Sequence, residues 1–324
     1  MYSRSMKVLI AEFFWQHTEV LGTWIDYFCR RGDSITIFYP ELLKTPHNYV
    51  GIWEHIYDIT VNYNGHINMF EFDLIVVNTQ QPELITHLRT FGKPIIEVNH
   101  YAVAPASAAG QEIAGQEIAG QEIAVNPFRR LPSGKQQFVL PVCPALADTL
   151  ADTRRGMPVS RVISIIGNSF LALPAHLFKN LTTLLSRAGW TIQCVIYDYN
   201  NIDEYRSEHV IIKQNCLARE LFDQVKNSRF ILFCPGAHHF YNQLSGAIIL
   251  SLLFGRPLIT VSDVLSFYNI TTHYNINNLD FLSKLDDEAY YMGAQRHLEV
   301  RLNEFIAAGR QTLGTIVEQF VGSA

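Results

Sequence analysis

The sequence predicts an α/β protein made of two doubly wound, Rossmann-like domains that face a cleft. The first observation is a set of short runs in which apolar residues are consecutive and not alternating, as parallel strands covered on both faces require. The second is that these runs alternate with amphipathic segments of helical length in each half of the chain. The third is the length of 324 residues, which suits two domains that each bury a core.

The first half carries four apolar runs that we expect to be strands. The run Lys7–Ala11 precedes an amphipathic helix over Val20–Arg31. Gly32 is placed to end that helix, because glycine adopts the left-handed conformation of a helix end. The later elements are strands at Ser34–Tyr39, Phe72–Asn78 and Pro94–Asn99 and a helix at Glu83–Phe91. They form an N-terminal Rossmann-like domain, predicted at residues 1–145.

The second half repeats the alternation. We expect strands at Arg161–Ile166, Thr191–Tyr197, His209–Ile212, Phe230–Cys234 and Leu258–Val261, with helices near Pro174–Ala188, Leu217–Asn227 and Ser245–Phe254. The predicted C-terminal domain covers residues 160–290. The proline-containing segment Leu140–Val159 is the predicted hinge.

The last 34 residues, 291–324, are predicted to be a C-terminal helix. Its apolar stripe falls within Gln295–Phe320, and Gly309 and Gly314 weaken the pattern and are candidates for kinks. The stripe is equally consistent with a helix packed on its own domain and with one that crosses back to the N-terminal domain.

Residues 109–124 repeat the pentapeptide AGQEI three times. The isoleucines lie five positions apart, so they share no face of a helix, and a glycine in every unit further disfavours helix. We interpret the repeat as a tandem-duplication insert in a surface loop, and deletion of one or two units is expected to leave the melting temperature nearly unchanged.

Composition narrows the protein class. The net charge of −5 gives no general attraction to nucleic acid or to an anionic membrane. No apolar run reaches the length of about 18 residues that a membrane span needs. The five cysteines form no Cys-x-x-Cys pair and are interpreted as buried thiols in a reducing compartment. With no signal-peptide pattern at the start, we expect a cytoplasmic protein with at most peripheral membrane contact.

Two segments of the second half are candidate phosphate-binding sites. Gly167, Asn168 and Ser169 follow a predicted strand and precede a helix that contains Lys179. Such a turn offers backbone donors at the carboxyl edge of a sheet, although it is equally an ordinary tight turn. The helix start at Ser245–Gly246 leaves N–H groups uncovered and adds the positive end of a helix dipole. Gly-x-Gly-x-x-Gly and Walker A patterns are missing from the sequence, which argues against dinucleotide-binding and P-loop proteins.

The order and spacing of residues 160–262 resemble the donor-binding domain of GT-B glycosyltransferases, and residues 7–101 resemble their first domain more loosely. The resemblance implies that a nucleotide sugar binds here, with its base against the loop Lys213–Cys216 and its sugar and phosphate against Gly236–Tyr241. Many retaining members carry two donor-binding glutamates, whose positions fall at Asn242 and Leu250 here. Asn242 can still hydrogen-bond a sugar hydroxyl, whereas Leu250 cannot bind ribose. A pocket built from Gln243, Ser245 and backbone groups is the remaining option.

The resemblance also indicates candidate catalytic residues. Several inverting members carry a catalytic histidine in the loop after the first strand, and that loop holds Glu12 and His17 with aromatics between them. A carboxylate or a neutral imidazole can take the proton of an acceptor hydroxyl. In retaining relatives a histidine at a position like that of His100 contacts the donor sugar. All three side chains are also consistent with structural roles. His238 and His239 are adjacent and point apart, so we predict no metal site there.

The sequence therefore predicts a glycosyltransferase that moves a sugar from a nucleotide-sugar donor to a hydroxyl of a glycan or other small acceptor. No cofactor or catalytic metal is expected, because a helix dipole can neutralise the leaving diphosphate, and no nucleic-acid partner is expected. Two alternatives stay open. One is a polysaccharide pyruvyltransferase-like enzyme, whose usual Arg-x-His is missing here; the other is a degenerate, non-catalytic GT-B-like binding protein.

Overall fold

The computed structural model describes residues 5–14, 18–44, 48–79, 82–99, 120–124, 139–143, 145–146, 160–167, 173–196, 202–234, 246–260, 265, 268–271, 274–278 and 280–321. The chain divides into two compact units. The first consists of Met1–Leu146, Asn242–Leu244 and Phe305–Ala324, and the second of Ala147–Tyr241 and Ser245–Glu304. Among the described residues, each unit contains a six-stranded parallel sheet, which confirms the predicted architecture of two doubly wound α/β units.

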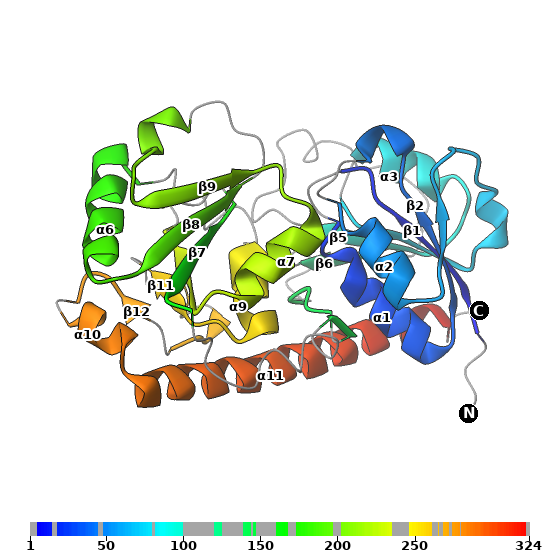
Figure 1. Cartoon of the computed structure of the whole chain (residues 1–324). Helices are drawn as coiled ribbons and strands as arrows, with labels where there is room; N and C mark the ends of the chain where they lie inside the picture. Colours follow the sequence, from blue (N-terminus) through cyan, green and yellow to red (C-terminus); the bar gives the residue numbers. More distant parts are fainter. Residues whose placement is uncertain are drawn as a thin grey trace. The chain divides into compact units, whose positions relative to one another are not determined.

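The first sheet has the strand order β3-β2-β1-β4-β5-β6 (Figure 1). Its strands are β1 (Lys7–Ala11), β2 (Ser34–Phe38), β3 (Thr60–Asn62), β4 (Leu74–Val77), β5 (Ile95–Asn99) and β6 (Gly120–Ala124). The chain steps outward from β1 to β2 and β3 and then returns to β4 on the other side of β1, so the order reverses between β1 and β4. Ligands of open α/β sheets bind at the carboxyl ends of the strands beside such a reversal.

Three α-helices connect these strands, namely α1 (Leu21–Arg31), α2 (Val50–Ile56) and α3 (Pro82–Arg89). As predicted, α1 ends at Gly32, whose φ of +84° is left-handed. The ring of Trp53 on α2 lies directly against Gly22 on α1, where an added Cβ would come within 2.5 Å of the ring. Gly22 therefore allows the close packing of α2 on the first turn of α1.

The second sheet repeats the topology, with the order β12-β11-β10-β7-β8-β9. Its strands are β7 (Val162–Ile166), β8 (Thr191–Ile196), β9 (Val210–Gln214), β10 (Phe230–Phe233), β11 (Leu258–Thr260) and β12 (Tyr274–Asn275), and the helices are α6 (Ala175–Arg187), α7 (Ala218–Lys226), α9 (Gly246–Phe254) and α10 (Phe281–Leu285). Here the order reverses between β7 and β10, so the carboxyl ends of these two strands are the expected ligand position of this unit.

The C-terminal helix α11 (Glu288–Val321) is longer than the predicted stripe and is the long orange-to-red helix of Figure 1. Its residues up to Glu304 belong to the second unit and those from Phe305 to the first. The helix continues through Gly309 and Gly314. At Gly309 an added Cβ would lie 3.2 Å from Cγ1 of Val139, so glycine here allows a close approach of the segment 139–143.

The last unit of the pentapeptide repeat differs from the surface-loop prediction. Residues 120–124 form β6, which pairs in parallel with β5 along its whole length. The isoleucine spacing was compared only with the period of a helix. A strand at the edge of a sheet forms through backbone hydrogen bonds, which depend little on the side-chain pattern, so that comparison could not reveal β6. Residues 109–119 lie outside the described part of the chain.

Candidate functional site

The carboxyl ends of β1 and β4 carry a buried polar network in the first unit. Glu12 follows β1 and is completely buried. Its Oε1 accepts the backbone N–H of Phe14 at 2.6 Å, and its Oε2 accepts the side-chain amide of Asn78 and the hydroxyl of Thr79, the latter at 3.1 Å. The indole N–H of Trp24 donates to Oδ1 of Asn78 at 2.6 Å, which fixes the orientation of that amide. The network joins the two strand ends at the point where the strand order reverses.

Burial has the largest effect on the pKa of the Glu12 carboxyl group. Loss of solvation raises its pKa to about 7, although the hydrogen bonds from Asn78, Phe14 and Thr79 act in the opposite direction. Both oxygens already accept hydrogen bonds from the protein. This arrangement suits a carboxyl group that positions the loop after β1 and the residues after β4.

A second carboxyl group, that of Glu19, lies on the turn that leads into α1. The residue is partly exposed. Loss of solvation around its carboxyl group, with a further contribution from the nearby Glu12 charge, raises its pKa to about 8. The preceding residue is anchored, because the Thr18 hydroxyl accepts the N–H of Tyr49 at 3.0 Å and its carbonyl accepts the Trp53 indole N–H at 2.8 Å. Glu19 therefore stands on a fixed turn at the carboxyl edge of the sheet, and this residue is partly exposed. Glu19 was not predicted from the sequence, because only its position between the loop after a strand and the start of a helix pointed to a site.

In the second unit, the carboxyl ends of β7 and β8 border a small pocket. Its lining residues are Ile166, Gly167, Val195, Ile196, Cys216 and Leu221, and its volume is about 220 Å³ with the opening to solvent included. Gly167 has a left-handed φ of +66°, and its N–H donates to the carbonyl of Val195 at 2.8 Å. That N–H is therefore committed to the protein, while the open space beside its Cα leaves room for a ligand.

Lys213 lies at the same edge of the sheet. It is a residue of β9 and not of a loop, in contrast to the prediction, because the strand continues to Gln214. Its ammonium group lies close enough to the Cys216 thiol to oppose the rise in pKa that burial causes there. Asn215, between them, has a left-handed φ of +57°, which is uncommon for a residue with a side chain. Lys213 thus supplies a positive charge beside the pocket.

The helix α9 begins at Gly246 and is buried on every side after that residue. As the crossover between β10 and β11, it has its N-terminus at the carboxyl edge of the sheet, and an added Cβ at Gly246 would meet open space. Leu250 on the same helix is part of the core, so it contacts no ligand. Lys179 lies one turn inside α6 and is half-buried.

Several predicted site residues lie outside the described part of the chain. They are His17, His100, Asn168, Ser169, Asn242, Gln243 and Ser245. Their roles, and the catalytic role of Glu12, stay predictions. Within the described residues, no group of three or more histidine, cysteine, aspartate or glutamate side chains is arranged to hold a metal ion. Among those same residues, no helix combines the length and the apolar character of a membrane span.

Comparison with solved structures identifies the fold. Over 94% of this chain and 96% of the other, the protein is similar to an α-glucosyltransferase in complex with UDP and a 13-mer DNA, with a TM-score of 0.62 and 11% identity. A glycosyltransferase from Rickettsia africae gives a TM-score of 0.56 at 12% identity, covering 99% of this chain and 100% of the other. BGT of T4 phage, with its UDP-glucose substrate, gives 0.55 at 9% identity over 98% and 99% of the two chains. The chain has the GT-B fold. No family model and no curated protein sequence matches it.

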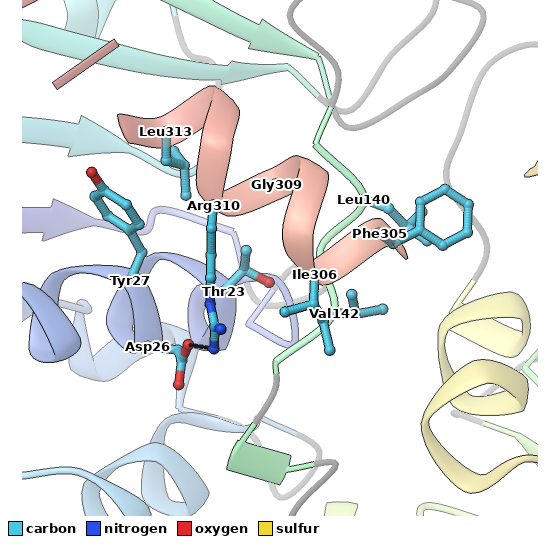
Figure 2. A pocket seen from close by; sticks show the side chains of 10 residues that line it. All are labelled: Thr23, Asp26, Tyr27, Leu140, Val142, Phe305, Ile306, Gly309, Arg310 and Leu313. Carbon is cyan, nitrogen blue, oxygen red and sulfur yellow. Dashed lines mark hydrogen bonds and ion pairs between the residues drawn. The ribbon is translucent and has the colours of Figure 1, made fainter. Parts of the chain in front are cut away.

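The GT-B fold of this chain has a second pocket, which lies within its first unit (Figure 2). It is lined by α1, by the end of α11 and by Leu140 and Val142. Asp26 on α1 is buried and binds the Arg310 guanidinium on α11 at 3.3 Å. Asp26 also accepts the Tyr57 hydroxyl at 2.9 Å. These contacts attach this part of α11 to α1.

This attachment can be tested by a pair of substitutions. Asp26→Ala leaves the half-buried Tyr57 hydroxyl without its carboxylate acceptor, also removes the ion pair of Asp26 with Arg30, and is expected to lower the free energy of unfolding by about 1–3 kcal/mol. Arg310→Met is expected to cost less than about 1 kcal/mol, because the guanidinium is 43% exposed. Urea unfolding measures both. Equal losses would mean that the ion pair, and not the burial of Asp26, dominates.

Proposed function

We propose that this protein is a glycosyltransferase that moves a sugar from a nucleotide-sugar donor to a hydroxyl of an acceptor. The observation that carries the proposal is the carboxyl edge of the second sheet, where the start of α9, a pocket and Lys213 lie at the ends of neighbouring strands. The GT-B fold over nearly the whole chain supports it, and two of the similar structures contain UDP or UDP-glucose.

The donor diphosphate is assigned to the start of α9. The positive end of the helix dipole favours an anion there, and an added Cβ at Gly246 would meet open space. The nucleoside is assigned to the pocket beside Gly167, with Lys213 at its edge. In this arrangement the leaving diphosphate is neutralised by protein groups, so the proposal includes no catalytic metal.

Gly246→Glu tests the donor site. The new carboxylate adds repulsion at the helix start and is expected to weaken UDP binding at least about tenfold. Gly293→Glu is the matched control, because Gly293 also lies in a helix of the second unit and an added Cβ there also meets open space. Calorimetric titration with UDP, and then with GDP, ADP, CMP and TDP, measures affinity. Unchanged nucleotide affinity in Gly246→Glu would remove the diphosphate from this position.

In the first unit we propose that Glu19 accepts the proton of the acceptor hydroxyl and that Glu12 holds the loop after β1 in place. A general base must reach the hydroxyl and must be ionised when it reacts. Glu19 is partly exposed, whereas both oxygens of Glu12 are buried and engaged. Phe13 on the same loop packs against Phe38 at the end of β2, with ring centroids 5.3 Å apart, and this pair offers apolar surface to a sugar ring.

The acceptor class is tested by direct comparison. The structure with the highest TM-score among those named contains DNA, and another α-glucosyltransferase complex contains DNA with an HMU base, so DNA carrying such a base is a second candidate acceptor. The net charge of −5 favours a carbohydrate or another small hydroxyl compound. Transfer of labelled sugar to glycans and to such DNA distinguishes the two. Nucleotide binding without transfer or hydrolysis would support a degenerate binding protein, and no nucleotide binding would favour a pyruvyltransferase-like enzyme.

A further inference from the structure

The amino edge of the second sheet, opposite the proposed donor site, carries a buried arginine among aromatic rings. Arg229 directly precedes β10 and is 6% exposed. Its guanidinium lies 5.7 Å from the ring centroid of Trp190, 5.7 Å from that of Phe230 and 5.1 Å from that of Tyr291. Arginine stays protonated even when buried, so a full positive charge sits inside this cluster.

The donors of this cluster lack acceptors. Nε and Nη2 of Arg229, Nε1 of Trp190 and the Tyr274 hydroxyl are buried and form no hydrogen bond. Trp190 and Tyr274 both pack on Phe230, with ring centroids 5.3 and 4.8 Å from it, so these side chains and Arg229 belong to one cluster. Ring faces attract a guanidinium but leave its in-plane N–H groups unsatisfied. A buried donor without an acceptor costs about 1–3 kcal/mol.

Neighbouring charges do not supply the missing acceptor. The carboxylate of Asp286 binds Arg161 at 2.7 Å, and that of Asp280 binds Lys284 at 2.8 Å. Asp287 is exposed, and its Oδ1 accepts the N–H of Tyr290. The cluster therefore combines one buried positive charge with hydrogen-bond donors from three side chains.

We propose that Arg229, Trp190 and Tyr274 form a binding site for a small inorganic anion of the size of chloride. Arginine and tryptophan side chains donate hydrogen bonds and accept none, so a bound water would leave its own hydrogens without acceptors, whereas an anion has none to satisfy. The anion would also compensate the guanidinium charge, whose burial alone is costly. The three side chains are at most 6% exposed, so the site suits a small ion and not a phosphate ester or a larger organic acid.

Thermal unfolding of the full chain in sodium chloride and in sodium gluconate of equal ionic strength tests this site. An ion that binds only the folded state raises the melting temperature, here by about 2–4 °C in chloride. Arg229→Met is expected to abolish the difference between the two salts. Arg161→Met is the matched control and is expected to keep it, since Arg161 also stacks on Trp190 but is paired with Asp286. Equal melting temperatures of the wild type in both salts, or a preserved difference in Arg229→Met, would overturn the proposal.

A second measurement applies if Arg229→Met fails to fold. Bromide quenches tryptophan fluorescence on contact, and Trp190 is separated in sequence from the other three tryptophans, Trp15, Trp24 and Trp53. Wild-type protein is expected to show a saturable quenching component that is missing in Trp190→Phe. Quenching that is linear in bromide, or identical in the two proteins, would contradict the site.

Discussion

Glu19→Gln is expected to lower turnover by roughly 10²–10⁴-fold while nucleotide affinity stays unchanged, because glutamine keeps the shape of the side chain but cannot accept a proton. The pKa of Glu19 is raised to about 8 by burial and by Glu12. A base acts in its ionised form, so the wild-type rate should rise with pH and level off above about 8. Initial rates from pH 6 to pH 9.5 at saturating donor measure both the loss and the profile.

Three further variants assign the proton acceptor. Glu41→Gln, at an exposed position of the same unit, should have wild-type turnover. If His17 is the base, His17→Ala should show the large loss instead, with a profile that rises near the ordinary histidine pKa of about 6.5. If Glu12 is the base, Glu12→Gln should be severe and Glu19→Gln mild. Wild-type turnover in Glu19→Gln would remove this residue from the mechanism without affecting the assignment of the donor site.

The sheets of this protein could be predicted because their signal is local. Runs such as Lys7–Ala11 and Val162–Ile166 carry buried residues at consecutive positions, most of them apolar, as a parallel sheet covered on both faces requires. The end of α1 at Gly32 was likewise predictable from one residue. By contrast β3 (Thr60–Asn62) and β12 (Tyr274–Asn275) are too short and too polar to show a period. β6 depends on backbone pairing with β5, which no side-chain pattern reports.

The candidate site was harder to predict, since its chemistry depends on residues far apart in sequence. The sequence placed Glu12 in the loop after β1 but could not show that Asn78, 66 positions away, donates to its carboxylate. Nor could it show that Thr18 is anchored by α2, which is what holds Glu19 on a fixed turn. Lys213 was identified as a site residue, but its strand extends further than its apolar run.

The Glu12 network gives the last prediction, which concerns stability. Asn78→Asp replaces the amide that donates to Glu12 with a second buried carboxyl, while Oδ1 can still accept from Trp24. At pH 8 two buried carboxylates would face each other, and the free energy of unfolding is expected to fall by about 3–5 kcal/mol, as when a buried charge loses its partner. At pH 5 one carboxyl is protonated and can donate in place of the amide, so the loss should shrink to about 1 kcal/mol.

The sign of this pH dependence follows from the direction of the pKa shift. The folded-state pKa of Glu12 already lies above its unfolded value, at about 7 against 4.5. Its contribution to stability is therefore fully present below pH 4.5 and is lost as the pH rises through 7. A second carboxyl raises the coupled pKa values further and steepens that loss. Urea unfolding at pH 5 and pH 8 measures this loss of stability.

Asn68→Asp is the matched control, because the Asn68 amide also donates to a glutamate, Glu71, but on the exposed surface. Its expected change is within about 0.5 kcal/mol at either pH, and an equally small change in Asn78→Asp at pH 8 would show that Glu12 is not held in a buried network.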